Sequence, residues 1–227
     1  MNHQMTRRTV LRTAAFAGAT AAVGSVLPAA SASAVEGREP KRPATSANGW
    51  TIQANADHDS QVWTRPVEGT GLSVAVWIGD VETILLHVVR RFHYEIEEIP
   101  RIDLAGWREI GTLHKGLPES NLASGTAVRI RPGAAAKGGF FPLQELVLRD
   151  ILAECEGVVR WGGDDRTVDE SLFYLAAGPH DTRVAKVAGK LRGWEATPGE
   201  GAGAGVDVLV PSRRSRAVGL ARVQRSA

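Results

Sequence analysis

The sequence predicts an α+β domain in which helices flank a small antiparallel sheet. Residues 80–96 and 142–155 carry apolar side chains at helical spacing. Short runs that are rich in β-branched and aromatic residues lie between these segments, as at 72–78, where Gly71 and Gly79 bound LSVAVWI. Helices that alternate with short, non-parallel strands are typical of this fold class.

The residues that bound each segment predict ten elements. Pro100 follows the first helix, Gly157 follows the second, and residues 126–130 alternate in polarity as a strand does. In chain order we expect extended segments at 50–52 and 62–64, a strand at 72–78, a helix at 80–96 capped by Asp80, a strand and turn within 106–115, a strand at 126–130, a helix at 142–155, strands at 158–161 and 172–176, and a helix at 180–193.

Residues 1–34 are typical of a twin-arginine export signal. The Arg7–Arg8 pair precedes an Ala-rich apolar run, and Ala32-Ser33-Ala34 fits an A-x-A cleavage site. The run is too short and too rich in alanine for a comfortable membrane span. We therefore expect cleavage before Val35 and a secreted or cell-wall-associated protein, and the alternative is an N-terminal anchor that stays attached.

The composition of the remaining chain restricts its partners. Removal of Arg7, Arg8 and Arg12 changes the formal net charge of +2 to −1, which does not indicate nucleic-acid binding. Cys155 is the only cysteine, so no intrachain disulfide can form. We expect no membrane span in the mature chain, and the composition does not indicate an oligomeric state.

Two flanking segments are expected to lie outside the folded domain of residues 49–194. Residues 35–48 are rich in Pro, Ser, Glu and Lys without an apolar period, which predicts a disordered leader. Residues 195–227 begin with a glycine-rich linker and end with five arginines, which predicts a flexible basic tail. This tail either contacts anionic wall polymers or is inert.

A first motif lies at residues 120–131, SNLASGTAVRIR. It resembles the metal-binding segment S-x-H-x-x-G-x-A-x-D of the zinc D-alanyl-D-alanine carboxypeptidases and related peptidoglycan endopeptidases. Ser120, Gly125 and Ala127 fit that pattern. Leu122 stands at the position of the histidine ligand, and Arg129 stands at that of the aspartate ligand.

A second motif, WGGDDRTVDESLF at 161–173, supports the resemblance. It is similar to the W-G-G-D…D-x-x-H-F segment of the same family, through Trp161, Asp164, Asp169 and Phe173. Leu172 stands at the position of the third zinc ligand. The resemblance implies the small α+β fold of that family and places Asp169 at the general-base position.

The replaced positions are incompatible with zinc. A catalytic zinc site uses lone pairs from three protein ligands, and leucine offers none. Arginine stays protonated and only donates hydrogen bonds. We therefore expect no metal or other cofactor. We also expect Leu122 and Leu172 to be buried together, and Arg129 to pair with Asp169 or Asp164 as a substitute for the cation, unless Arg129 lies on a solvated strand face.

The resemblance implies a groove and hence a set of candidate ligand-binding residues. They are Ser120, Asn121, Arg129, Trp161, Asp164 and Asp169. The favoured hypothesis is a secreted, metal-free pseudopeptidase that binds peptidoglycan peptides or another wall component. The alternatives are a hydrolase that uses Asp169, His114 and Asp164 in a rearranged site, and a structural exported domain without a ligand.

Overall fold

A computed structural model describes residues 43–133 and 137–226. The expected export signal at 1–34 and most of the expected leader lie outside these residues. These residues belong to one compact unit. Its regular elements are β1 (Val62–Val67), β2 (Leu72–Trp77), α1 (Asp80–Glu95), β3 (Leu104–Ala105), β4 (Ala127–Ile130), α2 (Pro142–Glu154), β5 (Val159–Trp161), β6 (Leu172–Leu175), α3 (Thr182–Glu195) and α4 (Pro211–Arg225).

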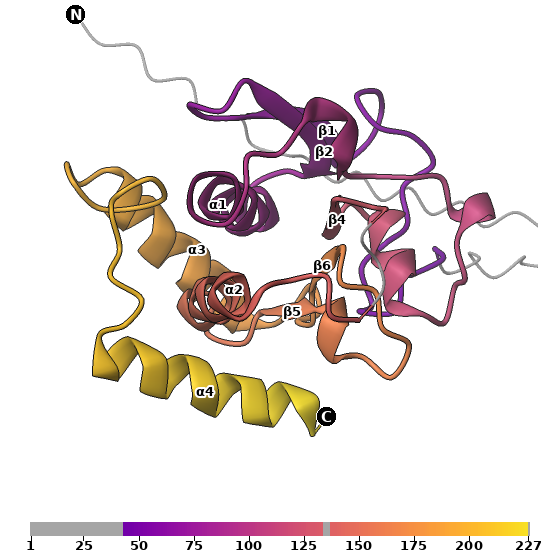
Figure 1. Cartoon of the computed structure of the whole chain (residues 1–227). Helices are drawn as coiled ribbons and strands as arrows, with labels where there is room; N and C mark the ends of the chain where they lie inside the picture. The colour runs from indigo at the N-terminus through magenta and orange to yellow at the C-terminus, as the bar shows by residue number, and fades with distance from the viewer. Residues whose placement is uncertain (1–42, 134–136, 227) are drawn as a thin grey trace, which may run out of the picture. The chain divides into compact units, whose positions relative to one another are not determined.

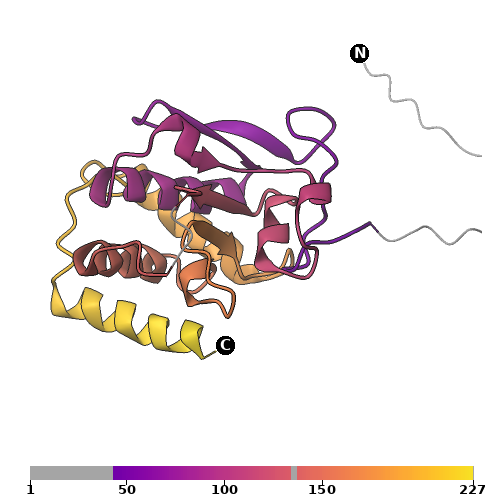
Figure 2. The same cartoon turned by 45° about the vertical axis from the view of Figure 1, so that its right-hand side comes forward.

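Two small antiparallel sheets confirm the predicted α+β class. β1 and β2 form a hairpin, and the second sheet has the strand order β3-β4-β6-β5. Backbone hydrogen bonds join β2 to the segments that follow β3 and precede β4, since Trp107 N donates to Ala75 O and Trp77 N donates to Gly125 O. Figure 1 and Figure 2 show α1 between the hairpin and α2, with α4 on the far side of α2.

The main core forms where α1 and α2 pack against one face of the four-stranded sheet and α3 packs against α1. Val128 of β4 and Phe173 of β6 point into this core and are almost completely buried. Their neighbours Ala127, Leu172 and Tyr174 belong to a second, smaller cluster with Leu122. The alternation of side chains along β4 and β6 therefore separates the helix-covered face from a face that carries the candidate site.

The C-terminal segment differs from the expected flexible tail. It contains α4, a helix that packs against α2 with Ala217, Ala221 and Gln224 buried. Arg213 anchors its first turn by ion pairs to Asp150 and Glu154 at 2.5 and 2.6 Å. The prediction of a tail was wrong because these contacts come from charges distant in sequence, which an apolar period cannot reveal.

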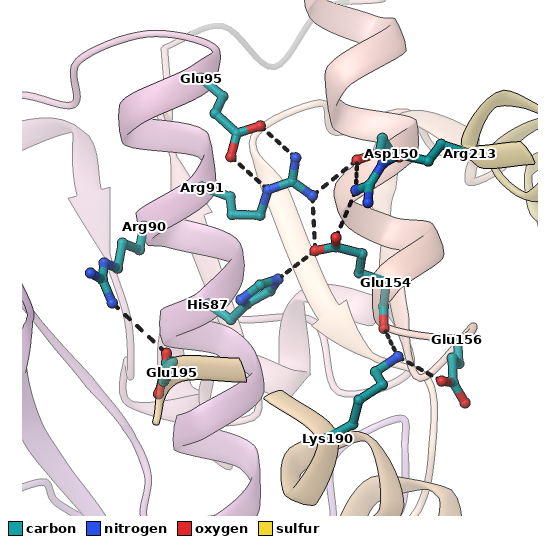
Figure 3. Close-up of polar contacts among 10 residues, drawn as sticks. All are labelled: His87, Arg90, Arg91, Glu95, Asp150, Glu154, Glu156, Lys190, Glu195 and Arg213. Carbon is teal, nitrogen blue, oxygen red and sulfur yellow. Dashed lines mark hydrogen bonds and ion pairs between the residues drawn. The ribbon is translucent and has the colours of Figure 1, made fainter. Parts of the chain in front are cut away.

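The anchor of α4 is part of a buried charge cluster, drawn in Figure 3. Arg91 of α1, only 1% exposed, contacts Asp150 at 3.0 Å and Glu154 at 2.9 Å. His87 contacts the same Glu154 carboxylate at 3.0 Å. Burial raises the pKa of Glu154, but His87, Arg91 and Arg213 outweigh it and bring the value to about 2. The cluster thus joins α1, α2 and α4 through ionised groups.

Two further expectations need correction. Gly79, with φ +87°, is the N-cap of α1 instead of Asp80, and its N–H donates to the Glu82 carboxylate at 3.2 Å. Ordered structure also begins before Trp50. Ser46 is buried, and Asn48 Nδ2 donates to Leu175 O at 2.9 Å. These contacts place the last residues of the expected leader, 43–48, against the sheet.

Candidate functional site

The first motif forms a turn that leads into β4. A 3-10 helix at Pro118–Leu122 precedes Gly125, which has φ +69°. A Cβ atom at Gly125 would lie 2.4 Å from Val62 Cγ2 and 2.9 Å from Trp77 N. Only glycine fits both the backbone angle and this close approach. The motif glycine therefore sets the position of β4 against the hairpin.

The register of the sheet brings the three replaced positions together. Arg129 of β4 lies opposite Leu172 of β6, so their side chains share a face. Leu122 packs in the same cluster as Leu172, and the two are 0% and 2% exposed. This confirms the prediction that both leucines are buried together.

Arg129 forms the predicted ion pair at this face. Its Nη2 lies 3.0 Å from Asp169 Oδ2 and 3.1 Å from Glu119 Oε2, and all three side chains are about one-fifth exposed. Asp169 Oδ1 accepts hydrogen bonds from Ser171 N at 3.1 Å and from Ser171 Oγ at 2.5 Å. Arg129 thus supplies a fixed positive charge between two carboxylates.

Glu119 extends this group toward solvent. His114 donates its backbone N–H to Glu119 Oε1 at 2.8 Å, and its ring Nδ1 lies 2.6 Å from the same oxygen. Burial raises the pKa of Glu119, but these contacts and Arg129 outweigh it and hold the pKa below its usual value. The His114 side chain is 81% exposed and contacts Glu119 instead of Asp169.

Asp164 and Trp161 lie in a separate, buried arrangement. The Asp164 carboxylate accepts hydrogen bonds from both terminal nitrogens of Arg149 and also forms an ion pair with Arg225 at 3.1 Å. The Arg149 guanidinium lies 4.8 Å from the Trp161 ring centroid, and Trp161 Nε1 donates to Glu170 O at 2.8 Å. Asp164 and Trp161 are therefore held by structural contacts and form no groove with Arg129, although Asp164 lines a surface depression beside Arg225.

Ser120 and Asn121 also have structural roles. Both are buried, and each side chain accepts a hydrogen bond from a backbone N–H of the segment that precedes Trp50. Ser120 Oγ accepts from Ala47 at 2.9 Å, and Asn121 Oδ1 accepts from Asn48 at 3.1 Å. The expected groove therefore does not include these side chains, and of the six candidates only Arg129 and Asp169 contact each other at the partly open face.

Sequence reasoning missed Glu119 and Arg149. Glu119 directly precedes the first motif, so an acidic residue next to Ser120 was the available sign that a further carboxylate lies near Arg129. Arg149 lies four residues after Glu145 on the predicted helix, a spacing that indicates an ion pair, and that pair forms at 3.0 Å. Its second partner, Asp164, follows only from the tertiary fold.

The donor set of this face does not fit a metal ion. Leu122 and Leu172 offer no lone pairs, and the guanidinium of Arg129 would repel a dication. Within residues 43–133 and 137–226, no three His, Cys, Asp or Glu side chains are grouped as metal ligands.

Comparisons with known proteins identify no relative, so any function has to be argued from the residues of this chain. The chain matches no family model, no curated protein and no solved structure. Among the helices that the structure describes, none combines the length and apolar character required to cross a bilayer.

Proposed function

We propose that this chain is a metal-free pseudopeptidase, exported by the twin-arginine route, that binds a peptidoglycan component in the cell wall. In this proposal it is a degenerate relative of the zinc D-alanyl-D-alanine carboxypeptidases. The observation that carries the proposal is the convergence of Leu122, Arg129 and Leu172, which the motifs align with zinc ligands, on one sheet face.

The contacts of Arg129 support the loss of hydrolysis by the zinc mechanism. In that mechanism the metal lowers the pKa of a bound water to about 7, and a carboxylate at the position of Asp169 removes its proton. Here Asp169 contacts a guanidinium, which cannot bind and activate a water in that way. The guanidinium thus occupies the position of the cation without supplying its chemistry, and a binding role remains compatible with this face.

The alternative of a rearranged hydrolase receives less support. It requires His114, Asp164 and Asp169 to act on one substrate. His114 contacts Glu119, while Asp164 is occupied by Arg149 and Arg225. His114 and Asp169 are therefore joined only through Glu119 and Arg129, and Asp164 belongs to a separate set of contacts.

Co-sedimentation with purified peptidoglycan tests the binding proposal. Residues 35–227, which contain the whole compact unit, should pellet with the polymer and be released by soluble stem peptides. The matched control replaces the exposed Arg214, Arg216 and Arg222 of α4 by glutamine, which removes positive charge without changing the site. Pelleting that disappears in this control and does not respond to stem peptides would indicate charge-driven adsorption and refute the proposal.

Restoring the ligands tests the family relationship independently. The triple variant Leu122→His, Arg129→Asp, Leu172→His should bind one zinc ion, measured by equilibrium dialysis, and zinc should raise its melting temperature. The control keeps Arg129 and carries only the two histidines, so it lacks one ligand and retains the repulsive charge. A folded triple variant that binds no more zinc than this control would refute the alignment of the three positions.

A further inference from the structure

A depression of about 820 Å³ opens where the last turn of α4 meets the four-stranded sheet. Its walls include Leu117, Pro118, Arg160, Asp165, Arg166 and Tyr174. Tyr174 also belongs to the small cluster that contains Leu122 and Leu172. The depression thus lies on the sheet face that carries the candidate site, and its volume is in the range of small-ligand sites, about 300 to 1,000 Å³.

A preformed polar network lines part of this depression. Tyr174 Oη donates to Asp165, with distances of 2.9 and 3.0 Å to the two carboxylate oxygens. Arg160 Nη2 lies 3.5 Å from Asp165 Oδ1 and donates to Gln224 O of α4 at 2.8 Å. Burial, and the negative charges of Asp164 and Asp169, raise the pKa of Asp165 above its usual range. A ligand that donates a hydrogen bond to Asp165 would therefore relieve an unfavourable charge.

The same depression offers an accessible cation. Its ion pairs join Arg160 to Asp165 and Arg225 to Asp164, and within the described residues none involves Arg166. Arg166 lines the depression and is exposed. Its planar guanidinium is suited to bidentate recognition of a carboxylate.

We propose that this depression binds a small ligand in which a carboxylate lies close to a hydrogen-bond donor, with the carboxylate on Arg166 and the donor on Asp165. The proposal deepens the proposed function and rests on it for the biological source of the ligand. An amino-acid or peptide end carries a carboxylate with an ammonium or amide donor, and an acidic sugar carries a carboxylate with hydroxyl groups. Both sources share the required chemistry.

Helix α4 completes the site. Gln224 Nε2 donates to Val159 O of the edge strand at 2.8 Å, and residues 224–226 form one wall of the depression. The opposite end of α4 is anchored by Arg213 in the charge cluster of Figure 3. Because both ends of the helix are fixed to the domain, this wall is preorganised for a ligand.

Backbone amide chemical shifts of residues 35–227 test the site with three probes. L-Lysyl-D-alanine and N-acetylmuramic acid represent the two sources of carboxylate, and the C-terminal amide of the dipeptide lacks the carboxylate. At least one acid should shift amides within 160–167 and at 174 in a saturable manner. The dipeptide amide should bind about tenfold or more weaker than the dipeptide if the dipeptide is the ligand.

Arg166→Ala should weaken the binding acid about tenfold or more, and Arg166→Lys should retain part of the affinity. The control Arg101→Ala removes an exposed arginine beside Gly71 of the hairpin turn and should not change binding. Absence of saturable shifts with both acids, shifts confined to other regions, or unchanged affinity in Arg166→Ala would overturn the proposal.

The two proposals fail in different ways. If the protein pellets with peptidoglycan equally well with and without Arg166, the proposed function stands and the depression is not its site. If an acid binds through Arg166 but the polymer does not pellet the protein, the ligand site stands and the wall-binding function falls.

Discussion

Replacement of Arg129 by methionine tests whether the guanidinium stabilises the face that the motifs align with a metal site. Methionine keeps much of the length of the side chain and removes the charge and the donors. Glu119 and Asp169 would then lose the cation whose Nη2 lies within 3.1 Å of both. We expect the variant to fold with a lower free energy of unfolding at neutral pH.

The magnitude follows from two charged hydrogen bonds and their exposure. A hydrogen bond to a charged group contributes about 1.5 to 3 kcal/mol. Solvent screens this group because each side chain is about one-fifth exposed. We therefore expect a loss of about 2 to 3 kcal/mol, below the 3 to 5 kcal/mol of a completely buried pair.

The pH dependence has a defined sign. The pKa of Glu119 is held below its usual value, so its contribution to stability is present above the pKa of the unfolded chain and is lost as the pH falls through the folded pKa. The destabilisation by Arg129→Met should therefore be largest at pH 7 and should diminish as the pH falls through the folded pKa of Glu119.

Urea unfolding at 25 °C measures these differences. Addition of Asp169→Asn to Arg129→Met should recover about 1 kcal/mol by removing one unpaired charge. The control Arg131→Met removes an ion pair to Glu97 whose side chains are 27% and 42% exposed, and should cost at most about 1 kcal/mol. If Arg129→Met is no more destabilising than this control, or if its effect persists at acid pH, the reasoning is refuted.

Two further predictions use the same unfolding assay. Asp164→Asn should cost about 2 to 4 kcal/mol at pH 7, because the buried Arg149 loses its bidentate partner. Asp165→Asn should lower the free energy of unfolding by less than about 1 kcal/mol, or raise it. The pKa of Asp165 is raised in the folded protein, so its ionised carboxylate destabilises the fold as the pH rises through that pKa, and asparagine carries no such charge. Gly125→Ala should cost about 2 to 4 kcal/mol, because it combines a positive φ with a clash against Val62.

Each of these predictions has a matched comparison. The two aspartates are adjacent, so equal effects of the two asparagine variants at pH 7 would contradict the opposite pKa shifts. For the glycine, Gly111→Ala provides the control, because a Cβ atom there meets no heavy atom within 4 Å. Similar costs at Gly111 and Gly125 would show that loss of glycine, and not the close approach, determines the effect.

The sequence predicted those parts of the fold that depend on local pattern. The apolar periods at 80–96 and 142–155 correspond to α1 and α2, and the run at 72–78 corresponds to β2. The Arg129–Asp169 pair was predictable because a cation was expected where two motifs place a carboxylate nearby. These features depend on spacing within a segment or on chemical complementarity between two recognised segments.

The remaining site could not be predicted, because its contacts depend on tertiary placement. Trp161 and Asp164 were expected in a groove, but Arg149 of α2 reaches across and covers them. Such a contact requires the relative position of a helix and a loop, which neither segment encodes alone. Burial of Trp161 beneath a guanidinium therefore appears only in the folded molecule.

The C-terminal helix shows the same principle in its energetics. The completely buried side chains of α4 are small or polar, and Leu220 packs partly buried against the main core, so apolar burial is only one part of its attachment. Arg213 adds a second part, because it enters a site where Asp150 and Glu154 already lie beside Arg91. Without Arg213, two buried carboxylates would share fewer positive partners, which is costly in a low-dielectric interior. The helix and the charge cluster are consequently interdependent, and the wall that α4 gives to the depression depends on an ion pair at its opposite end.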